Sequence, residues 1–218
     1  MNDGGLWSRM LPNFDSYTFT DQSQNVTLDS MAQRLLDTAP TQFILMGFSM
    51  GGYVARHIAL AAPERVTALI LANTSARPSN AKTIKRNRLV IGITEQNGFQ
   101  GLSRKARQKA LHPEKCNDEE LLQEMQDMAL RLGQTSFLNQ LGLERPNGIP
   151  TLGEIKCPTL VIWSRQDKLR SLEEAQELAN GIPDAKLEII EDCGHMTPME
   201  APEKLIALLG KWQFLSNK

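Results

Sequence analysis

The feature that most restricts how this chain can fold is a serine flanked by glycines between a short apolar run and a helical run. Residues 43–46 are apolar, the pentapeptide Gly47-Phe-Ser-Met-Gly51 follows, and a helical pattern extends from Met50 to Ala62, before Pro63. A sharp turn of this kind needs small residues two positions before and after the serine, because larger side chains would clash there. The pattern predicts that the Ser49 hydroxyl points out of the sheet at the start of a helix, where free backbone N–H groups favour negative charge.

Other apolar runs predict further strands, with helices between them. The expected strands are 43–46, 66–72, 159–163 and 186–190, with a weaker candidate at 16–20. Helical patterns cover 28–38, 50–62, 172–179 and 201–214. The first three strands are nearly continuous in apolar residues, as strands covered on both faces are. Alternating strands and helices predict an α/β fold with a mostly parallel sheet, flanked by helices through right-handed crossovers.

Residues 79–143 interrupt this alternation, since they hold no convincing strand. A helix start is expected at Asn117, which Asp-Glu-Glu follows, and apolar residues then recur at helical spacing. Glycines are expected to divide the region into about four helices, at Gly92, Gly98, Gly101 and Gly133. We therefore expect a core formed by residues 1–78 and 146–218, with a helical cap insertion at 79–145.

Composition narrows the classes of function. The 218 residues suit one ordinary domain, and a net charge of −1 gives no sign of a nucleic-acid or anionic-membrane partner. No run approaches the roughly 18–20 apolar residues of a membrane span, and the first residues lack a signal-peptide pattern. The three cysteines are widely spaced and form no zinc pattern, which is typical of free thiols in a reducing compartment. We predict a cytoplasmic protein without a metal or cofactor.

Three histidines could act as the base that a serine nucleophile needs. His195 lies in Glu191-Asp-Cys-Gly-His195, after the last strand, at the edge where open α/β sheets gather functional groups. His57 falls two turns past Ser49 inside a helix and is expected in packing or solvent. His112 precedes a proline in the helical region and is expected at the surface or as a cap, with a weaker claim to a substrate cleft. We predict that His195 is the base.

A carboxylate at the end of another strand would orient the histidine. Asp167 follows the strand at 159–163 through Ser164-Arg-Gln and fits this place. Asp192 competes, but it lies only three residues from His195 and is expected to make a local turn bond. The chain order Ser49, Asp167, His195 is that of folds with a G-x-S-x-G elbow and differs from the two well-known protease orders.

Two longer motifs carry a resemblance to a known family. The serine turn reads Gly47-Phe-Ser-Met-Gly-Gly52 and the histidine loop reads Glu191-Asp-Cys-Gly-His-Met-Thr-Pro-Met-Glu200. These resemble the motifs G-x-S-M-G-G and E-x-x-G-H-x-x-P-x-E of small, esterase-like members of the α/β-hydrolase superfamily. The stretches 61–66, 73–77 and 155–160 are similar too, so the resemblance runs from about residue 4 to the end.

The resemblance implies an α/β-hydrolase fold with a helical cap over the site. It implies the nucleophile, orienting acid and base roles for Ser49, Asp167 and His195. It also implies that the backbone N–H of Met50 is one oxyanion-hole donor, which can be worth about 3–4 kcal/mol in a transition state.

The start of the chain departs from the family pattern. Family members usually begin with an apolar strand and a loop that supplies the second oxyanion N–H, and only then continue with a segment like Asn2-Asp-Gly-Gly-Leu-Trp7. We expect the native product to carry roughly 10–20 more N-terminal residues, the length of one strand and its loop. No residue of this sequence is assigned as the second donor.

The predicted function is hydrolysis of an ester through an acyl-serine intermediate, on a small-molecule acyl substrate. Thioesters, lactones, small amides and acyl transfer remain open within this chemistry, and so does a non-catalytic small-ligand receptor or scaffold on the same fold. A cofactor-independent oxygenase is a weaker alternative. Residues 79–110 carry eight Lys or Arg against one Glu, which predicts solvated helix faces or a basic rim that attracts anionic acyl compounds.

Overall fold

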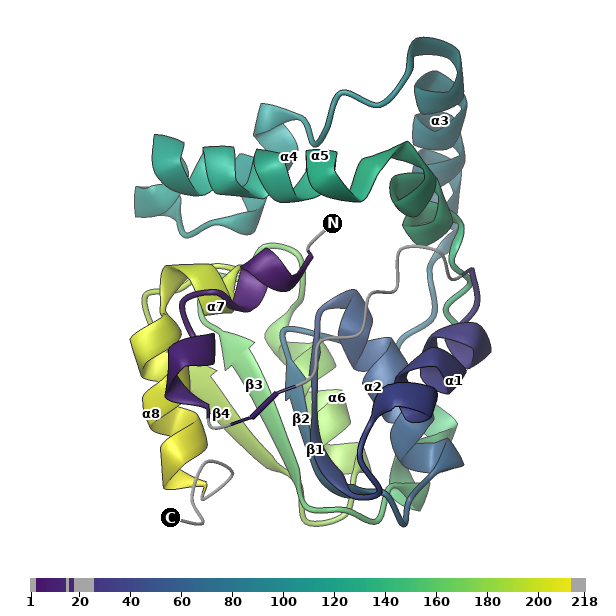
Figure 1. Ribbon diagram of the computed structural model, residues 1–218, viewed down its shortest axis with the longest axis vertical. Coiled ribbons are helices and arrows are strands. Elements are labelled where there is room, and N and C mark those ends of the chain that lie inside the picture. The colour runs from purple at the N-terminus through teal and green to yellow at the C-terminus, as the bar shows by residue number, and fades with distance from the viewer. Residues whose placement is uncertain (1–2, 15, 18–25, 213–218) are drawn as a thin grey trace.

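A parallel sheet forms the centre of the computed structural model, which describes residues 3–14, 16–17 and 26–212 (Figure 1). Within these residues the strand order is β1-β2-β3-β4, and all pairs are parallel. The strands are β1 (Phe43–Phe48), β2 (Val66–Ala72), β3 (Thr159–Ser164) and β4 (Lys186–Ile190). The four main strand predictions and the α/β fold class are confirmed, although β1 runs two residues further than expected. The weak candidate at 16–20 lies mostly outside the described residues, and Ser16 and Tyr17 are not in a strand.

The central strands β2 and β3 are buried on both faces, which explains their continuous apolar sequences. Successive side chains of a strand point to opposite faces. Ile70 and Ile162 accordingly belong to one hydrophobic cluster, while Leu69 and Val161 belong to the other. Among the described residues β1 pairs with β2 alone.

Helices cover both faces of the sheet (Figure 1). Helices α1 (Leu28–Thr38), α2 (Met50–Ala61) and α6 (Leu172–Gly181) pack in one cluster, and α8 (Pro202–Lys211) packs in the other. Capping boxes at Thr27 and Ser171 satisfy the first N–H groups of α1 and α6. The last predicted helix ends at 211 within the described residues, and Phe214 lies outside them. The short helix α7 (Thr197–Glu200), just after His195, was not predicted.

Between β2 and β3 the chain forms a helical insertion that lies beyond the carboxyl ends of the strands (Figure 1). It contains α3 (Ala81–Asn97), α4 (Arg104–Ala110), the 3-10 helix η3 (Pro113–Lys115) and α5 (Glu119–Gly142). The helix-start prediction is wrong by one residue, because the Asp118 carboxylate accepts the N–H groups of Glu120 and Leu121. Gly133 has φ 74 and kinks α5.

The predicted break at Gly92 is wrong, because α3 continues through it. A glycine inside a helix costs only about 1 kcal/mol, so the flanking helix formers carry the helix past it. Gly98, with φ 76, does end α3. Division of the chain into two units, 1–78 with 146–218 and 79–145, remains a prediction.

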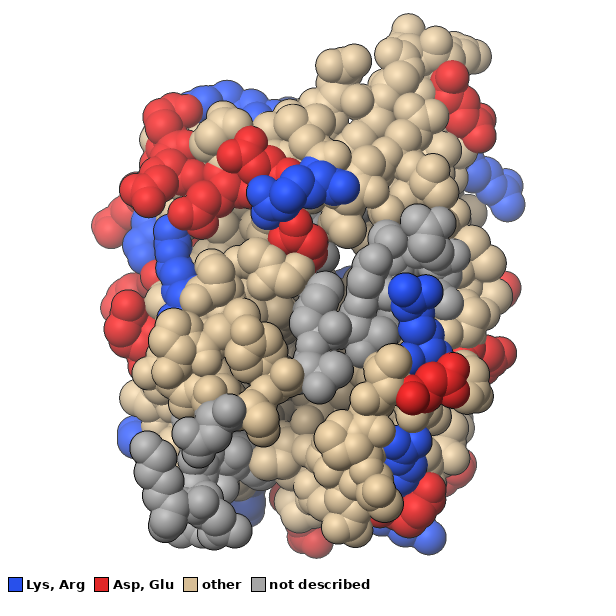
Figure 2. Space-filling model, in the orientation of Figure 1, with Lys and Arg blue, Asp and Glu red and all other residues tan. Residues whose placement is uncertain are grey.

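Charged side chains of the insertion partly pair with one another. Acidic side chains gather over the part of the insertion where α5 begins, which carries the exposed residues Glu119 and Glu120 (Figure 2). Arg104 of the basic helix α4 pairs with Glu119, and Arg107 donates to the carbonyls of Leu102 and Leu122. These two arginines are therefore used inside the insertion. The basic rim stays a prediction that rests on the other lysines and arginines of residues 79–110, which lie on α3 and α4.

The cysteines of the chain are all free. Cys193 is fully buried, and burial raises the pKa of its thiol to about 11. We expect iodoacetamide at mildly alkaline pH to modify the partly exposed Cys116 readily and to leave Cys193 unmodified until the protein is denatured, because the thiolate is the reactive form. Peptide mass spectrometry checks this, and comparable labelling of the two thiols in native protein would contradict it.

No helix of the described ranges is long and apolar enough to cross a membrane.

Candidate active site

Ser49 lies at the turn between β1 and α2 in a strained conformation, with φ 52 and ψ −115. The turn is held from both sides, since the Ser49 N–H donates to the Ala72 carbonyl at 2.9 Å and the Thr74 hydroxyl donates to the Ser49 carbonyl at 2.6 Å. Strain of this kind persists only where the surroundings enforce it. The turn therefore depends on contacts with β2 and the residues that follow it.

Two of the three glycines around Ser49 are required by close packing. A Cβ on Gly47 would lie 2.6 Å from the Ala55 Cβ and 2.6 Å from the Gly51 carbonyl oxygen, and one on Gly52 would overlap the Thr74 side chain. A Cβ on Gly51 meets nothing within 4 Å. The second glycine of the pentapeptide is thus not needed for space within the fold.

This difference gives a matched pair of variants. We expect Gly47→Ala to lower the free energy of unfolding by about 3 kcal/mol, because the methyl group meets backbone atoms that cannot move aside. Gly51→Ala should change it by less than about 1 kcal/mol, because alanine is favoured over glycine in a helix. Urea denaturation measures both, and equal destabilisation would contradict the packing argument.

His195 lies in the loop after β4, only 4% exposed, and faces Ser49. Its Nε2 is 2.9 Å from the Ser49 Oγ, and its Nδ1 is 2.7 Å from the Asp167 Oδ2. The other carboxylate oxygen of Asp167 accepts the backbone N–H groups of Leu169 and Arg170, at 2.7 and 2.9 Å. Because an ionised carboxylate can only accept, Nδ1 carries the proton and Nε2 is left to accept from the serine hydroxyl.

Direct bonds join the Asp167 turn to the histidine loop, which we define as residues 191–200. The backbone N–H of Arg165 donates to the carbonyl of Ile190 at the end of β4, and that of Gln166 donates to the Cys193 carbonyl in the loop. The Cys193 N–H in turn donates to the Gln166 side-chain oxygen at 3.0 Å. These bonds continue the pairing of β3 with β4 beyond the strands, so the pairing holds the acid and the histidine in register.

Asn73 is a residue of this site to which the sequence analysis gave no role. Its buried side-chain amide donates to the His195 carbonyl at 2.8 Å and to the Thr197 hydroxyl at 2.9 Å. It also lies 3.1 Å from the Ser164 hydroxyl. The Asn73 amide thus links the ends of β2 and β3 to the histidine loop. The sequence did contain a signal for this role, because Asn73 is a polar residue directly after the long apolar run of β2.

The competing residues lie elsewhere. His57 pairs with Asp29 of α1 at 2.7 Å, and the His112 Nδ1 accepts the Glu114 N–H at the start of η3. Asp192 is exposed and lies 3.4 Å from Lys204. The structure therefore brings together Ser49, Asp167 and His195 and leaves these three residues outside the group.

A free backbone N–H and aromatic packing lie next to Ser49 and His195. Met50 is the first residue of α2, so its backbone N–H has no acceptor within the helix and lies beside the serine. The Phe48 ring packs 5.1 Å from the His195 ring, and Trp7 meets Phe48 edge-on. In the described part of the chain, no three potential ligand side chains gather closely enough to hold a metal ion. The arrangement can move a proton from a hydroxyl to an imidazole backed by a carboxylate.

The chain is similar in sequence to proteins named as hydrolases. The chain is 31% identical over 174 residues to a 2-hydroxy-6-oxononadienedioate/2-hydroxy-6-oxononatrienedioate hydrolase of Paraburkholderia phymatum, covering 76% of this chain and 60% of that protein. It is 28% identical over 186 residues to human monoacylglycerol lipase ABHD6, covering 77% of this chain and 53% of that protein. The chain thus spans three fifths or less of the length of these two relatives.

The similarity to two solved structures extends over nearly the whole chain. An esterase of Thermogutta terrifontis, determined with malate bound, has a TM-score of 0.82 at 26% identity, covering 99% of this chain and 87% of that one. An enol-lactonase of Burkholderia xenovorans has a TM-score of 0.84 at 17% identity, which speaks for the fold alone. A model of the alpha/beta hydrolase family matches residues 7–208. The chain therefore belongs to the alpha/beta hydrolase family.

Proposed function

We propose that this protein is a serine hydrolase that cleaves a carboxylic ester or a related acyl bond through an acyl-serine intermediate. The observation that carries the proposal is the continuous chain of short contacts from the Ser49 Oγ through His195 to Asp167, at 2.9 and 2.7 Å. Hydrolase relatives support the same class of reaction. In this proposal Ser49 is the nucleophile, His195 the general base and Asp167 the residue that orients the imidazole.

The reaction proceeds in two halves. The Ser49 Oγ attacks the acyl carbonyl as its proton passes to the His195 Nε2, and the tetrahedral intermediate collapses when Nε2 returns that proton to the departing alcohol. Water then attacks the acyl-serine with the same base, which releases the acid and restores the hydroxyl. Asp167 stays ionised and stabilises the imidazolium in both halves.

The N–H of Met50 is proposed as one donor to the oxyanion. It belongs to the residue that follows the nucleophile and is free of intrahelical bonds, as the first N–H of α2. The second donor is left without an assigned residue.

The proposed substrate is a small-molecule acyl compound. Relatives named as a monoacylglycerol lipase and a dienedioate hydrolase show that related chains act on quite different compounds. The insertion over the carboxyl ends of the strands is the part of the fold that selects among them. The proposal needs no cofactor and no nucleic-acid or membrane partner, and three free thiols support a cytoplasmic location.

A fluorophosphonate probe tests the proposal directly, because it reacts covalently only with an activated serine. We expect one adduct, located at Ser49 by peptide mass spectrometry, and none in Ser49→Ala. Folded protein that takes up no probe and hydrolyses no ester would overturn the proposal in favour of a small-ligand receptor on the same fold.

A further inference from the structure

Glu200, at the end of α7, is a buried carboxylate that the mechanism above does not use. It is 6% exposed, yet it belongs to the histidine loop and faces the helical insertion. We propose that Glu200 is a positioning residue for His195, which joins the histidine loop to residues 110–115 of the insertion so that the reactive arrangement depends on the docked insertion. The role for His195 rests on the function proposed above.

Both oxygens of the Glu200 carboxylate accept backbone N–H groups from different parts of the chain. Its Oε2 accepts the N–H of His112 in the insertion at 2.6 Å, and its Oε1 accepts the N–H of Met196, next to His195, at 3.1 Å. Burial raises the pKa of this carboxyl, while its bonds to the backbone N–H groups act in the opposite direction. A buried carboxylate that bridges two backbone segments holds them at a set distance, since losing either bond leaves a buried polar group unpaired.

Backbone contacts reinforce this bridge on both sides. The carbonyl of Ala110, the last residue of α4, accepts the N–H groups of His195 at 2.8 Å and of Met196 at 3.3 Å. The Lys115 ammonium donates to the Glu200 carbonyl oxygen at 2.6 Å. The backbone of His195 itself is therefore bonded to the insertion.

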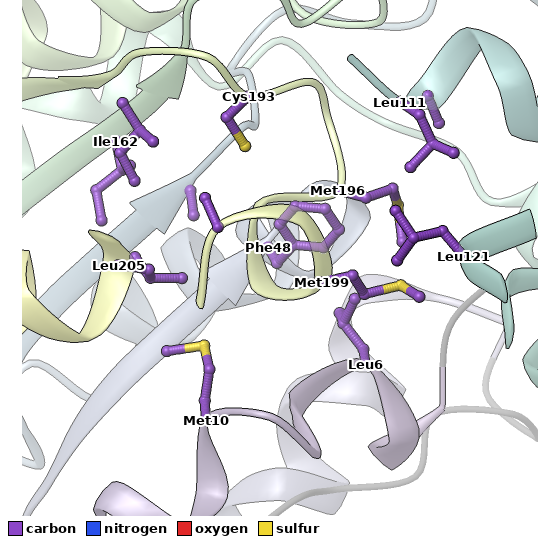
Figure 3. Packing of buried hydrophobic residues seen from close by; sticks show 14 of the residues in the cluster. Leu6, Met10, Phe48, Leu111, Leu121, Ile162, Cys193, Met196, Met199 and Leu205 are labelled. Carbon is purple, nitrogen blue, oxygen red and sulfur yellow. The ribbon is translucent and has the colours of Figure 1, made fainter. Parts of the chain in front are cut away.

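The two segments also fit closely in shape. A Cβ on Gly194 would overlap the backbone of Leu111, so only glycine allows this approach. Leu111 and Leu121 of the insertion face Met196 and Met199 of the histidine loop, and all four belong to one buried cluster (Figure 3). The docking of the insertion thus combines apolar packing with directed hydrogen bonds.

His195 is consequently held from two directions. Asn73 bonds to its carbonyl from the sheet side, and Ala110 bonds to its N–H from the insertion side. A displacement of residues 110–115 would release the second of these and shift the imidazole relative to Ser49. A misplacement of about 1 Å can cost roughly 100-fold in rate.

Glu200→Gln tests the inference, with Glu203→Gln as the matched control. The glutamine keeps the size of the side chain, but its NH2 group must face one of the two N–H donors. Glu203 is exposed and undergoes the same chemical change three residues away. We expect Glu200→Gln to lower kcat for a soluble ester by about 10- to 100-fold with KM changed less than about threefold. Glu203→Gln should behave as wild type.

Hydrogen–deuterium exchange separates positioning from unfolding. Peptides covering 110–115 and 194–197 should exchange faster in Glu200→Gln, while peptides from β1, β2 and β3 should be unchanged. Gly194→Ala, which separates the same segments by steric overlap, should give the same pattern. Faster exchange throughout the sheet, or a kcat within about twofold of wild type, would overturn the positioning role.

The same experiments distinguish this inference from the proposed function. Wild-type protein that takes up no fluorophosphonate and shows no turnover would overturn the function and, with it, the catalytic consequence of Glu200. Normal labelling and turnover in both wild type and Glu200→Gln would overturn the role of Glu200 alone.

Discussion

Replacing Ser49 with alanine should lower kcat for ester hydrolysis by about 10⁴- to 10⁶-fold, the largest effect we expect from any substitution in this chain. The loss corresponds to roughly 5.5–8 kcal/mol of transition-state stabilisation. The variant lacks the Ser49 Oγ, which lies 2.9 Å from the His195 Nε2 and is the atom that would form the acyl intermediate. Residual catalysis would come from the Met50 N–H and from binding alone.

The measurement is the hydrolysis of a chromogenic ester at saturating concentration. The matched control is Ser8→Ala, which removes the hydroxyl of an exposed serine outside the proposed triad. It should retain wild-type rates, and it controls for losses during expression and purification. Thermal unfolding of both variants shows that the fold is intact. A Ser49→Ala protein that keeps more than about a tenth of the activity would contradict the nucleophile assignment.

Asp167→Asn should lower kcat by about 10⁴-fold at neutral pH, although the substitution preserves size and shape. The Asp167 Oδ1 accepts the N–H groups of Leu169 and Arg170, so an asparagine must place its oxygen there. Its NH2 group then faces the His195 Nδ1 as a donor and forces the proton onto Nε2. That nitrogen points a hydrogen at the Ser49 hydroxyl and can no longer act as a base.

Two observations check the Asp167 prediction. Kinetics should show a fall in kcat with a smaller change in KM, and nitrogen NMR of His195 should show the proton on Nε2 in place of Nδ1. Asp192→Asn is the matched control, because Asp192 lies on the same loop as His195, exposed near Lys204. Its activity should equal that of wild type, and an equal loss in both variants would exclude the tautomer explanation.

Local patterns in the sequence predicted the four strands and the three side chains that the structure brings together. The apolar runs predicted β1, β2 and β3 because strands covered on both faces have few polar positions. The shorter strand β4 was predicted although it contains Lys186 and Glu188. The glycines around Ser49 marked the turn, and Asp167 and His195 were found because each follows a strand in a parallel sheet. The carboxyl ends of such strands meet at one edge, so order along the chain predicted proximity in space.

Local reasoning failed at two helices. Gly92 was read as a break because glycine is a poor helix former, yet α3 continues through it. The short helix α7 had no periodic signal, since it spans only four residues. In α3 the helix formers on both sides of Gly92 outweigh the cost of one glycine, whereas α7 is too short to show a periodic pattern.

By itself, the sequence determined the strands, the serine turn and the candidates for nucleophile, acid and base. Each of these is marked by a pattern of residues close together in the chain. Only the tertiary structure decided how those side chains are held. Asn73 and Ala110 reach His195 across 122 and 85 residues of sequence respectively. Such bonds depend on how the insertion docks on the sheet, and no periodicity encodes that docking, because it arises from packing between surfaces formed by distant segments.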